Sequence, residues 1–353
     1  MKKSRKIAII GAGVFGTTIA LRLSSAGYEC VIFEQKKDIL LSASRVNQYR
    51  FHRGYHYPRS ISTLKQLSET SPFFLKEYGD AVDDSFVHLY GLATNNSHIN
   101  TDQYISFLEK SNLKYKVNNK FNYLVTDQVT ELFEVEESLI NYNKLKFIIK
   151  ERINNQENLT VKLGTKFSKD LIDEYDHIIT CGYGMCQNLL PDDFQPYYKY
   201  QLVEKIVVKP PEELKNISLV IIDGPFMCID PLPLTNLSIL GNVKNAIHSS
   251  KIGKELPNFK EDATIKPWED ILKKSQSRFE SFINHGKQYI NYFDKCKFEY
   301  SMTGFRVIKP NVEKTDERTT IITTQDKFID IFSGKIDTCS WAANEVLNLL
   351  VKM

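Results

Sequence analysis

The sequence predicts an α/β fold: a Rossmann-like nucleotide-binding domain, assembled from discontinuous segments, with an inserted α+β domain that contains an antiparallel sheet. Three observations predict this arrangement. A glycine-rich turn joins a short apolar run to a helical pattern at the start of the chain. Apolar runs of the same kind return near residues 175–182 and 319–332. Between them, residues 198–300 contain alternating short apolar runs that are typical of antiparallel strands.

The glycine-rich turn stands in the full context of a dinucleotide-binding βαβ unit. The apolar run Ile7–Ile10 predicts a buried parallel strand and leads directly into Gly11-x-Gly13-x-x-Gly16. A helical pattern follows, and a second apolar run ends at Glu34. Glycines alone would be compatible with a turn that binds nothing. Strand, glycines, helix, strand and terminal acid together indicate a nucleotide site.

Each part of this motif has a physical task. Gly11 allows the tight turn, Gly13 lets the backbone approach a pyrophosphate, and Gly16 lets the helix lie close to the strand. The helix N-terminus offers free N–H groups and the positive end of its dipole to the phosphates. Glu34 is placed to accept hydrogen bonds from ribose hydroxyls, which argues against a cofactor with a 2′-phosphate. The motif does not separate NAD from FAD.

Composition sets limits on the partners. The chain has 353 residues, a net charge of +3 and 25% charged residues, which gives no case for a nucleic-acid partner. No stretch approaches a membrane span, and the six cysteines show neither metal-ligand nor disulfide spacing. We therefore expect a cytoplasmic protein with reduced thiols, no metal and a small-molecule substrate, in an oligomeric state left open. Abundant Lys, Asn and Ile suggest a bacterial source.

Apolar periodicity places the remaining elements in order along the chain. Helices are expected over residues 60–78, 104–108, 143–153, 268–292 and 333–350. Strands are expected over residues 86–90, 121–125, 132–135, 159–167, 175–184, 202–208, 219–222, 227–229, 237–240, 319–323 and 328–332. The nucleotide-binding domain then comprises residues 1–80, 143–190 and 301–353, and the inserted domain comprises residues 81–142 and 191–300.

The run from Ser42 to Arg59 is dense in Arg, His and Tyr and has neither helical nor strand periodicity. Such a run is either a solvated surface loop or a loop laid against an anionic cofactor. Its position directly after the dinucleotide unit favours the second interpretation.

At this point the chain resembles the D-amino-acid-oxidase-like family of FAD-dependent oxidoreductases, which includes glycine and sarcosine oxidases and L-2-hydroxyglutarate oxidase. Four features carry the resemblance, and together they span nearly the whole chain in the right order. They are the glycine motif with Glu34, the run Ser42-Ala43-Ser44-Arg45-x-Asn47 with His52-x-Gly54-x-His56-Tyr57, the segment Tyr175-Asp176-x-Ile178-Ile179-x-Cys181-Gly182, and the turn Phe332-Ser333-Gly334-Lys335.

The resemblance implies that the protein carries non-covalent FAD. Glu34 would hold the adenosine ribose, Ser44 and Arg45 would lie near the pyrophosphate, and Phe167 would clasp the adenine through its backbone. The helix after Gly334 would point its positive end at the flavin, where it stabilises the reduced, anionic form. The cofactor-binding residues expected on this basis are Gly11, Gly13, Val14, Phe15, Gly16, Glu34, Gln35, Ser44, Arg45, Asn47, Phe167, Cys181, Gly182, Gly334, Lys335, Ile336 and Asp337.

The substrate side rests on fewer residues. The family often has an Arg-Pro pair whose arginine grips a substrate carboxylate. Arg306 fits this role, but the proline is displaced to Pro310, and a surface salt bridge explains the arginine equally well. His52 and His56 are candidate proton acceptors, although a lone histidine is more often structural.

Three further residues near these positions are weaker candidates for the substrate site. They are two pocket-wall tyrosines and one lysine, namely Tyr55, Tyr57 and Lys309.

Two functions follow from these features, with a third reading beside them. The first is oxidation of a CH–NH or CH–OH bond of a small polar substrate by hydride transfer to flavin. The alternative is a flavoenzyme acting on a nucleotide sugar or glycan precursor, including a non-redox mutase of the UDP-galactopyranose mutase type, which the glycine motif and the loop also suit. The third reading is a flavin-binding protein without turnover.

Overall fold

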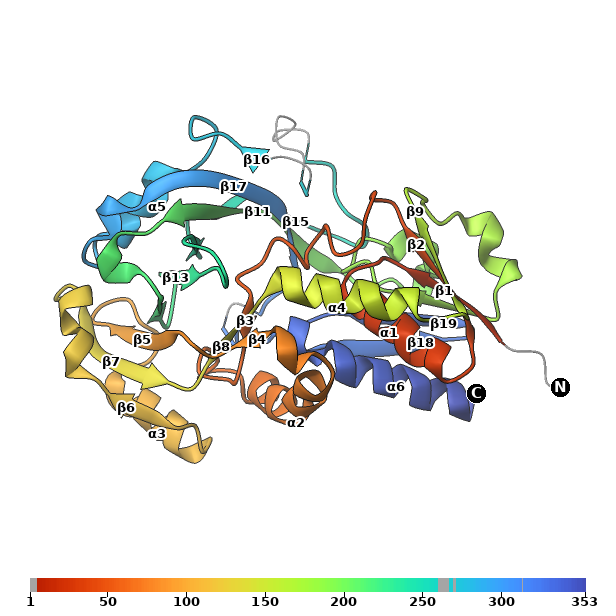
Figure 1. Ribbon diagram of the computed structural model, residues 1–353, viewed down its shortest axis with the longest axis horizontal. Coiled ribbons are helices and arrows are strands. Elements are labelled where there is room, and N and C mark those ends of the chain that lie inside the picture. The colour runs from red at the N-terminus through yellow and green to blue at the C-terminus, as the bar shows by residue number, and fades with distance from the viewer. Residues whose placement is uncertain (1–4, 260–266, 269–270, 313) are drawn as a thin grey trace.

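Three β-sheets organise the part of the chain that the computed structural model describes, residues 5–259, 267–268, 271–312 and 314–353 (Figure 1). A six-stranded sheet forms one half of the molecule and a ten-stranded sheet forms the other. A third, small sheet has three strands, which come in the sequence where the chain leaves one large sheet for the other. The helices of the described residues are α1 (Val14–Ser25), α2 (Ile61–Tyr78), α3 (Thr101–Lys110), α4 (Tyr142–Asn154), α5 (Phe279–Gly286) and α6 (Cys339–Lys352).

The six-stranded sheet is parallel except for one edge strand. In spatial order its strands are β18 (Ile321–Gln325), β19 (Phe328–Phe332), β10 (His177–Thr180), β1 (Lys6–Ile10), β2 (Glu29–Glu34) and β9 (Leu159–Leu163). Both faces are covered, because alternate residues of β1 enter two different apolar clusters. Ile7 and Ile9 pack with α1, α4 and α6, while Ala8 and Ile10 pack with Phe167 on the other face. Burial on both faces is what a continuous apolar strand requires.

The ten-stranded sheet is mainly antiparallel, and only β5 and β12 pair in parallel. Along the sheet its strands are β16 (Ile271–Leu272), β17 (Lys297–Ile308), β11 (Tyr198–Lys209), β14 (Ser238–Asn242), β13 (Met227–Pro231), β12 (Ile217–Ile222), β5 (Val87–Ala93), β7 (Val129–Val135) and β6 (Tyr115–Val117), with β15 (Ile247–Gly253) paired to β11. One face is apolar and packs against α5, and we call the opposite face the inner face. Figure 1 shows α5 beside β11 and β17 at the end of the molecule remote from α1 and α6.

The small sheet connects the loop after β2 to both halves of the molecule. Its strands are β3 (Arg50–Phe51), β8 (Ser138–Ile140) and β4 (Val82–Asp83). Arg50 pairs with Leu139 and Phe51 pairs with Ser138. This pairing fixes the position of the loop from residue 42 to residue 59, which we call the 42–59 loop.

Two expected elements are wrong. The strand expected at residues 121–125 is a 3₁₀ helix, Asn119–Leu124, because the Asn118 side chain accepts a hydrogen bond from the Lys120 N–H and closes a helical turn. The long helix expected at residues 268–292 is reduced to α5. Residues 271–272 instead pair with β17 as a strand. Residues 269–270 of that expectation lie outside the described residues.

The residues at which the chain passes from one domain to the other stay a prediction. The sequence placed the last return to the nucleotide-binding domain at residue 301. We propose that it falls after Ile308, because β17 pairs with β11 as far as that residue. The other expected boundaries stay predictions.

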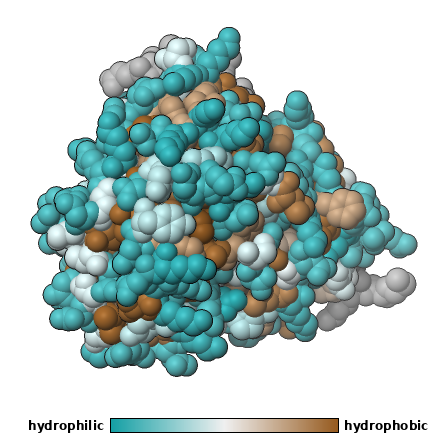
Figure 2. Space-filling model, turned by 60° about the vertical axis from the view of Figure 1, so that its left-hand side comes forward, coloured by the Kyte–Doolittle hydropathy of each residue, from teal (hydrophilic) through white to brown (hydrophobic). Residues whose placement is uncertain are grey.

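Figure 2 shows one face covered mostly by hydrophilic side chains, with apolar ones scattered between them. No helix among the described residues is long and apolar enough to cross a membrane.

Candidate active site

The glycine motif builds a cradle at the N-terminus of α1, next to the carboxyl ends of β1, β2 and β10. Gly13 is the N-cap residue, and no side chain of its own caps the helix. The hydroxyl of Ser44 accepts a hydrogen bond from the Val14 N–H at 3.0 Å, which brings the 42–59 loop to the cradle. The open end of a parallel sheet and a helix N-terminus whose N-cap residue has no side chain are what a pyrophosphate needs.

The three glycines meet different constraints in this cradle. Gly11 has a φ of +105°, and a Cβ on it would lie 2.9 Å from the Cys181 carbonyl oxygen. A Cβ on Gly16 would lie 1.9 Å from the Gly11 carbonyl oxygen, so helix and strand are in backbone contact there. A Cβ on Gly13 would meet only the Ser44 hydroxyl, at 3.3 Å. Gly11 and Gly16 therefore serve the fold, while Gly13 leaves space for a ligand.

Glu34 is directed back into this cradle from the end of β2. One carboxylate oxygen accepts the Ala12 N–H at 2.8 Å, and the other accepts the Lys36 N–H at 2.8 Å. The side chain is 9% exposed. Each oxygen keeps a free lone pair, because a carboxylate accepts about four hydrogen bonds.

Some of the other residues expected to bind the cofactor shape this cradle, and others pack against neighbouring side chains. The Asn47 amide donates to the Ala43 and Ser44 carbonyls and so shapes the turn itself. Phe167 is buried edge-on to the Phe33 ring, with centroids 4.9 Å apart. Val14 and Phe15 are buried, Arg45, Cys181, Gly182, Gly334 and Ile336 are partly exposed, and Gln35 is exposed.

The turn before α6 brings two opposite charges to the same place. The Lys335 ammonium lies 4.5 Å from the centre of the Tyr57 ring. Asp337 is fully buried, and neither carboxylate oxygen has a hydrogen-bond partner of ordinary geometry among the described residues. Burial lowers the pKa of Lys335 and raises that of Asp337, and each charge partly offsets the shift of the other.

The 42–59 loop is tied to the inner face by a buried ion pair. The Arg50 guanidinium lies on Asp230 of β13, with Nε 3.0 Å from Oδ1. Gln48 donates to the other oxygen of Asp230 at 2.6 Å, and Ser218 donates to Oδ1 at 2.6 Å. Because every oxygen of this buried carboxylate is bonded, the pair fixes the loop against the sheet.

His52 and His56 lie further along the same loop, with ring centroids 6.0 Å apart. Nδ1 of His52 lies 3.4 Å from Oε1 of Glu137, and neither atom has a hydrogen-bond partner among the residues described. Oε2 of Glu137 accepts from the Tyr90 hydroxyl at 2.7 Å. Burial, reinforced by the Lys335 and Arg50 charges, lowers the pKa of both histidines well below the ordinary value. Both rings are therefore neutral at neutral pH.

Arg306 lies on the inner face of β17, opposite Gln201 of β11. Its Nε donates to the Gln201 side-chain oxygen at 2.8 Å, and within the described ranges no carboxylate is in ion-pair contact with it. Burial and the nearby Arg318 charge lower its pKa to about 10, so it stays cationic at neutral pH. A partly buried cation held only by a neutral amide is suited to receive an anion.

The remaining substrate candidates are not all in the same place. Tyr57 contacts His52, His56 and Lys335 through its ring. Tyr55 instead donates its hydroxyl to the Lys114 carbonyl at 2.7 Å and packs in an apolar cluster with α3. Lys309 forms an ion pair with Glu317 at 2.8 Å.

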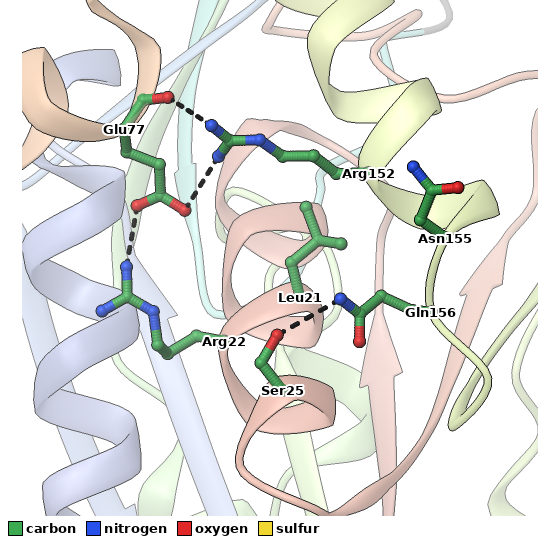
Figure 3. Close-up of a pocket in the computed structure, with 7 residues that line it drawn as sticks. All are labelled: Leu21, Arg22, Ser25, Glu77, Arg152, Asn155 and Gln156. Atoms are coloured by element: carbon green, nitrogen blue, oxygen red, sulfur yellow. Dashed lines mark hydrogen bonds and ion pairs between the residues drawn. The ribbon is translucent and has the colours of Figure 1, made fainter.

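A separate surface hollow lies away from these residues, between α1, α2 and α4 (Figure 3). Glu77 contacts Arg22 at 2.9 Å and Arg152 at 3.5 Å. The Glu77 carboxylate thus binds both cations of the hollow. We therefore interpret the hollow as a contact between helices and not as a ligand site. In the part of the chain described, no group of His, Cys, Asp and Glu side chains could hold a metal ion.

Comparisons with known proteins agree with this geometry. The family model described as "FAD dependent oxidoreductase" matches residues 6–110. The chain is 24% identical to the "FAD-dependent monooxygenase FPY4" of Fusarium mangiferae over 98% of this chain and 90% of the relative. It is also 24% identical to the "FAD-dependent monooxygenase kojA" of Aspergillus flavus over 98% of this chain and 85% of that relative.

Solved structures show the same fold over the whole length. Glycine oxidase from Geobacillus kaustophilus superposes with a TM-score of 0.72 at 11% identity, covering 99% of this chain and 95% of that one. L-α-glycerophosphate oxidase from Mycoplasma pneumoniae superposes with a TM-score of 0.70 at 15% identity, with the same coverage. The chain is thus similar to FAD-dependent oxidoreductases in its first 110 residues by family model and over its whole length by fold.

The enzyme uses FAD. Its own residues fit that cofactor. The N-cap residue of α1, Gly13, has no side chain to occupy the helix N-terminus, and the space beside it is open. The expectation of a bacterial source is contradicted, since the curated relatives matched here are fungal. A composition rich in Lys, Asn and Ile reflects base composition and does not identify a kingdom.

Several residues of the site were not expected from the sequence. They are polar groups of the inner face and its neighbours, of which Tyr90, His88, Glu137 and Asp230 are buried and Lys205 is partly exposed. His88 and Tyr90 lie on β5, the other three come from separate strands or a turn, and none belongs to a local motif. Only the alternation along each strand, combined with the register between strands, brings them to one face.

Proposed function

We propose that the enzyme oxidises a CH–NH or CH–OH bond of a small polar substrate that carries a carboxylate. The observation that carries this proposal is Arg306, a cation on the inner face with a neutral amide as its hydrogen-bond partner. A planar guanidinium can bind a carboxylate through two parallel hydrogen bonds, which fixes both the position and the orientation of the substrate.

The cofactor would be held by the residues of the cradle and of the turn before α6. Backbone N–H groups at the start of α1 and the Ser44 side chain would face the pyrophosphate, and Glu34 would bind the ribose. Bound FAD supplies an acceptor for the hydride that leaves the substrate carbon. The positive end of the helix at residues 335–339 favours negative charge beside it.

His52 is the proposed acceptor of the proton that leaves the substrate hydroxyl or amine. The ring is neutral because burial lowers its pKa, so a nitrogen is available to take the proton. Glu137, with Oε1 3.4 Å from Nδ1, stabilises by its negative charge the imidazolium that forms. The Tyr90 hydroxyl fixes Glu137 in turn. His56 and Tyr57 border the same space.

The test uses the purified holoenzyme without oxygen. We expect the flavin absorbance near 450 nm, a property of any flavin, to bleach on addition of at least one member of a panel of amino acids, N-methylated amino acids and 2-hydroxy acids. His52→Gln should slow that bleaching by about 10²–10⁴-fold, the usual contribution of a general base. Glu137→Gln should slow it less, while flavin content stays unchanged.

Other outcomes would contradict the proposal. Bleaching by NADPH and by none of the acids would favour a monooxygenase, as the names of the fungal relatives suggest. Conversion of a nucleotide sugar only after dithionite reduction would favour the mutase, which the comparisons do not support. No response to any compound would indicate a binding protein.

A further inference from the structure

A second cation lies on the inner face, four residues along the strand direction from Arg306. Lys205 follows Gln201 by four residues on β11, so the two side chains point to the same face. Gln201 is the register partner of Arg306 and Lys205 is the register partner of Met302. At about 3.3 Å of rise per residue, the two cationic residues start about 13 Å apart along the strands.

Lys205 has one hydrogen bond, from Nζ to the Gln48 side-chain oxygen at 2.8 Å. An ammonium carries three donors, and in the described ranges no carboxylate lies in ion-pair contact with this one. The residue is partly exposed, whereas Arg50 is buried. Burial and the Arg306 and Arg50 charges all lower its pKa.

The neighbouring carboxylate does not neutralise Lys205. Asp230 is committed to Arg50, Ser218 and Gln48, as described above. Gln48 lies between Asp230 and Lys205, and its amide is already fixed by Asp230 and by the Ile239 carbonyl at 3.0 Å. Bracing Gln48 therefore does not require a charged residue at position 205, since a neutral donor would serve equally well.

Arg50 and Lys205 thus differ in a way that indicates a ligand. Arg50 is a buried cation with a full anionic partner, which is the usual arrangement in protein interiors. Lys205 and Arg306 are cations of the same face with only amide partners. Two such cations, about 13 Å apart along one face, match a molecule with an anion at each end.

We propose that the substrate carries two anionic groups, of which Arg306 binds one and Lys205 binds the other. This inference rests on the proposed function, because it takes the inner face as the substrate site. Lys205 is then the residue that selects a doubly charged substrate over a singly charged one of the same length. The second anion is a carboxylate or a phosphate, since an ammonium binds either as a point charge.

The test measures binding to the oxidised holoenzyme by the change in the flavin spectrum. The probes are butyrate, with one anion, succinate, glutarate and adipate, with two carboxylates, and 4-phosphonobutyrate, with a carboxylate and a phosphonate. We expect the best dicarboxylate to bind at least tenfold more tightly than butyrate. Tighter binding of 4-phosphonobutyrate than of glutarate would assign the second anion as a phosphate, and the reverse order would assign it as a carboxylate.

Variants distinguish the contribution of Lys205 to binding from that of Arg306. Lys205→Met should abolish the preference for two anions and leave butyrate binding unchanged, while Lys205→Arg should retain most of it. Arg306→Met should weaken all probes. Lys209→Met, on the exposed end of the same strand, is the matched control and should change nothing. If Lys205→Met does not fold, Lys205→Gln answers the same question.

The inference is overturned if wild type shows no preference for two anions, or if the preference survives in Lys205→Met. Its failure is distinct from failure of the proposed function. A substrate that bleaches the flavin, together with no preference between glutarate and butyrate, removes only the second anion site. A Lys205-dependent preference without oxidation of any compound in the panel removes only the proposed reaction.

Discussion

The two large sheets of this enzyme contribute to the site in opposite ways. The six-stranded sheet buries both faces in apolar clusters, and its cradle is formed mainly by backbone groups at the ends of its strands. The ten-stranded sheet buries one face against α5 and presents charged side chains from several strands on the other.

This difference means that substitutions in the two halves should have different consequences. A backbone cradle depends on close approach between strand and helix, which few substitutions can alter without disturbing the fold. Side chains on a sheet face can be exchanged one at a time while the strand pairing stays the same. Cofactor binding is therefore coupled to folding here, and substrate choice is coupled to individual residues such as Arg306 and Lys205.

The largest effect on stability is expected where the cradle depends on direct contact between the backbones of helix and strand. A Cβ on Gly16 would lie 1.9 Å from the Gly11 carbonyl oxygen, so Gly16→Val must move α1 away from β1. We expect a loss of more than about 4 kcal/mol in the free energy of unfolding, and little soluble protein. Solubility and chemical denaturation measure this. A well-folded Gly16→Val enzyme with bound FAD would show that the contact is not needed.

The next effect concerns the ion pair that fixes the 42–59 loop to the inner face. Asp230→Ala would leave the buried Arg50 charge without a partner, at a cost of about 3–5 kcal/mol in the free energy of unfolding. The matched control is Glu280→Ala, which removes an exposed partner of Lys274 and should leave the melting temperature unchanged. Equal melting temperatures for the two variants would contradict a structural role for Asp230.

The sequence predicted the backbone half of the site much better than the side-chain half. The spacing of Gly11, Gly13 and Gly16 is local, so it identifies the turn, the helix and the approach to the phosphates directly. Arg50 and Asp230 are 180 residues apart in the chain, and no sequence feature near either residue indicates that the two form a pair. Pairing of that kind depends on strand register, which periodicity alone does not give.

The expected elements differed from the structure in a similar way. Strong apolar runs such as Ile7–Ile10 were identified correctly because burial on both faces leaves little ambiguity. Residues 121–125 have the same composition as a strand, but the Asn118 side chain closes a helical turn before them. The short α5 was overestimated because apolar residues at helical spacing also occur in the strand and turns that flank it.

A smaller effect is expected for substrate affinity. Arg306→Met removes the cation that holds the carboxylate, so binding should weaken by about 3 kcal/mol, or about 100-fold. Arg306→Lys should restore little of this, because a point charge does not reproduce the planar fork. Titration with the substrate identified by the panel measures the change. Unchanged affinity in Arg306→Met would place the substrate carboxylate elsewhere.

The smallest effect is a change in the pH dependence of stability. Burial lowers the pKa of His88, whose ordinary value is 6.5, so the unfolded state binds more protons than the folded state below that pH. Stability therefore falls as the pH drops below about 6.5. His88→Gln should reduce this slope by up to about 1.4 kcal/mol per pH unit. Because Asp337 shifts in the opposite direction, only the difference between wild type and variant isolates the histidine.

Chemical denaturation at several pH values measures this slope. His98→Gln, at an exposed histidine, is the control and should reproduce the wild-type slope. A His88→Gln slope equal to that of wild type would mean that His88 is protonated in the folded enzyme.

The most direct test of the contrast between the two sheets is the FAD content of two variants, purified side by side with wild type. Gly13→Val places a branched side chain in the open space of the cradle, and Arg306→Met changes only the inner face. The account predicts a folded, colourless Gly13→Val protein and an Arg306→Met protein with the FAD content of wild type. Retention of FAD by Gly13→Val, or its loss from Arg306→Met, would contradict it.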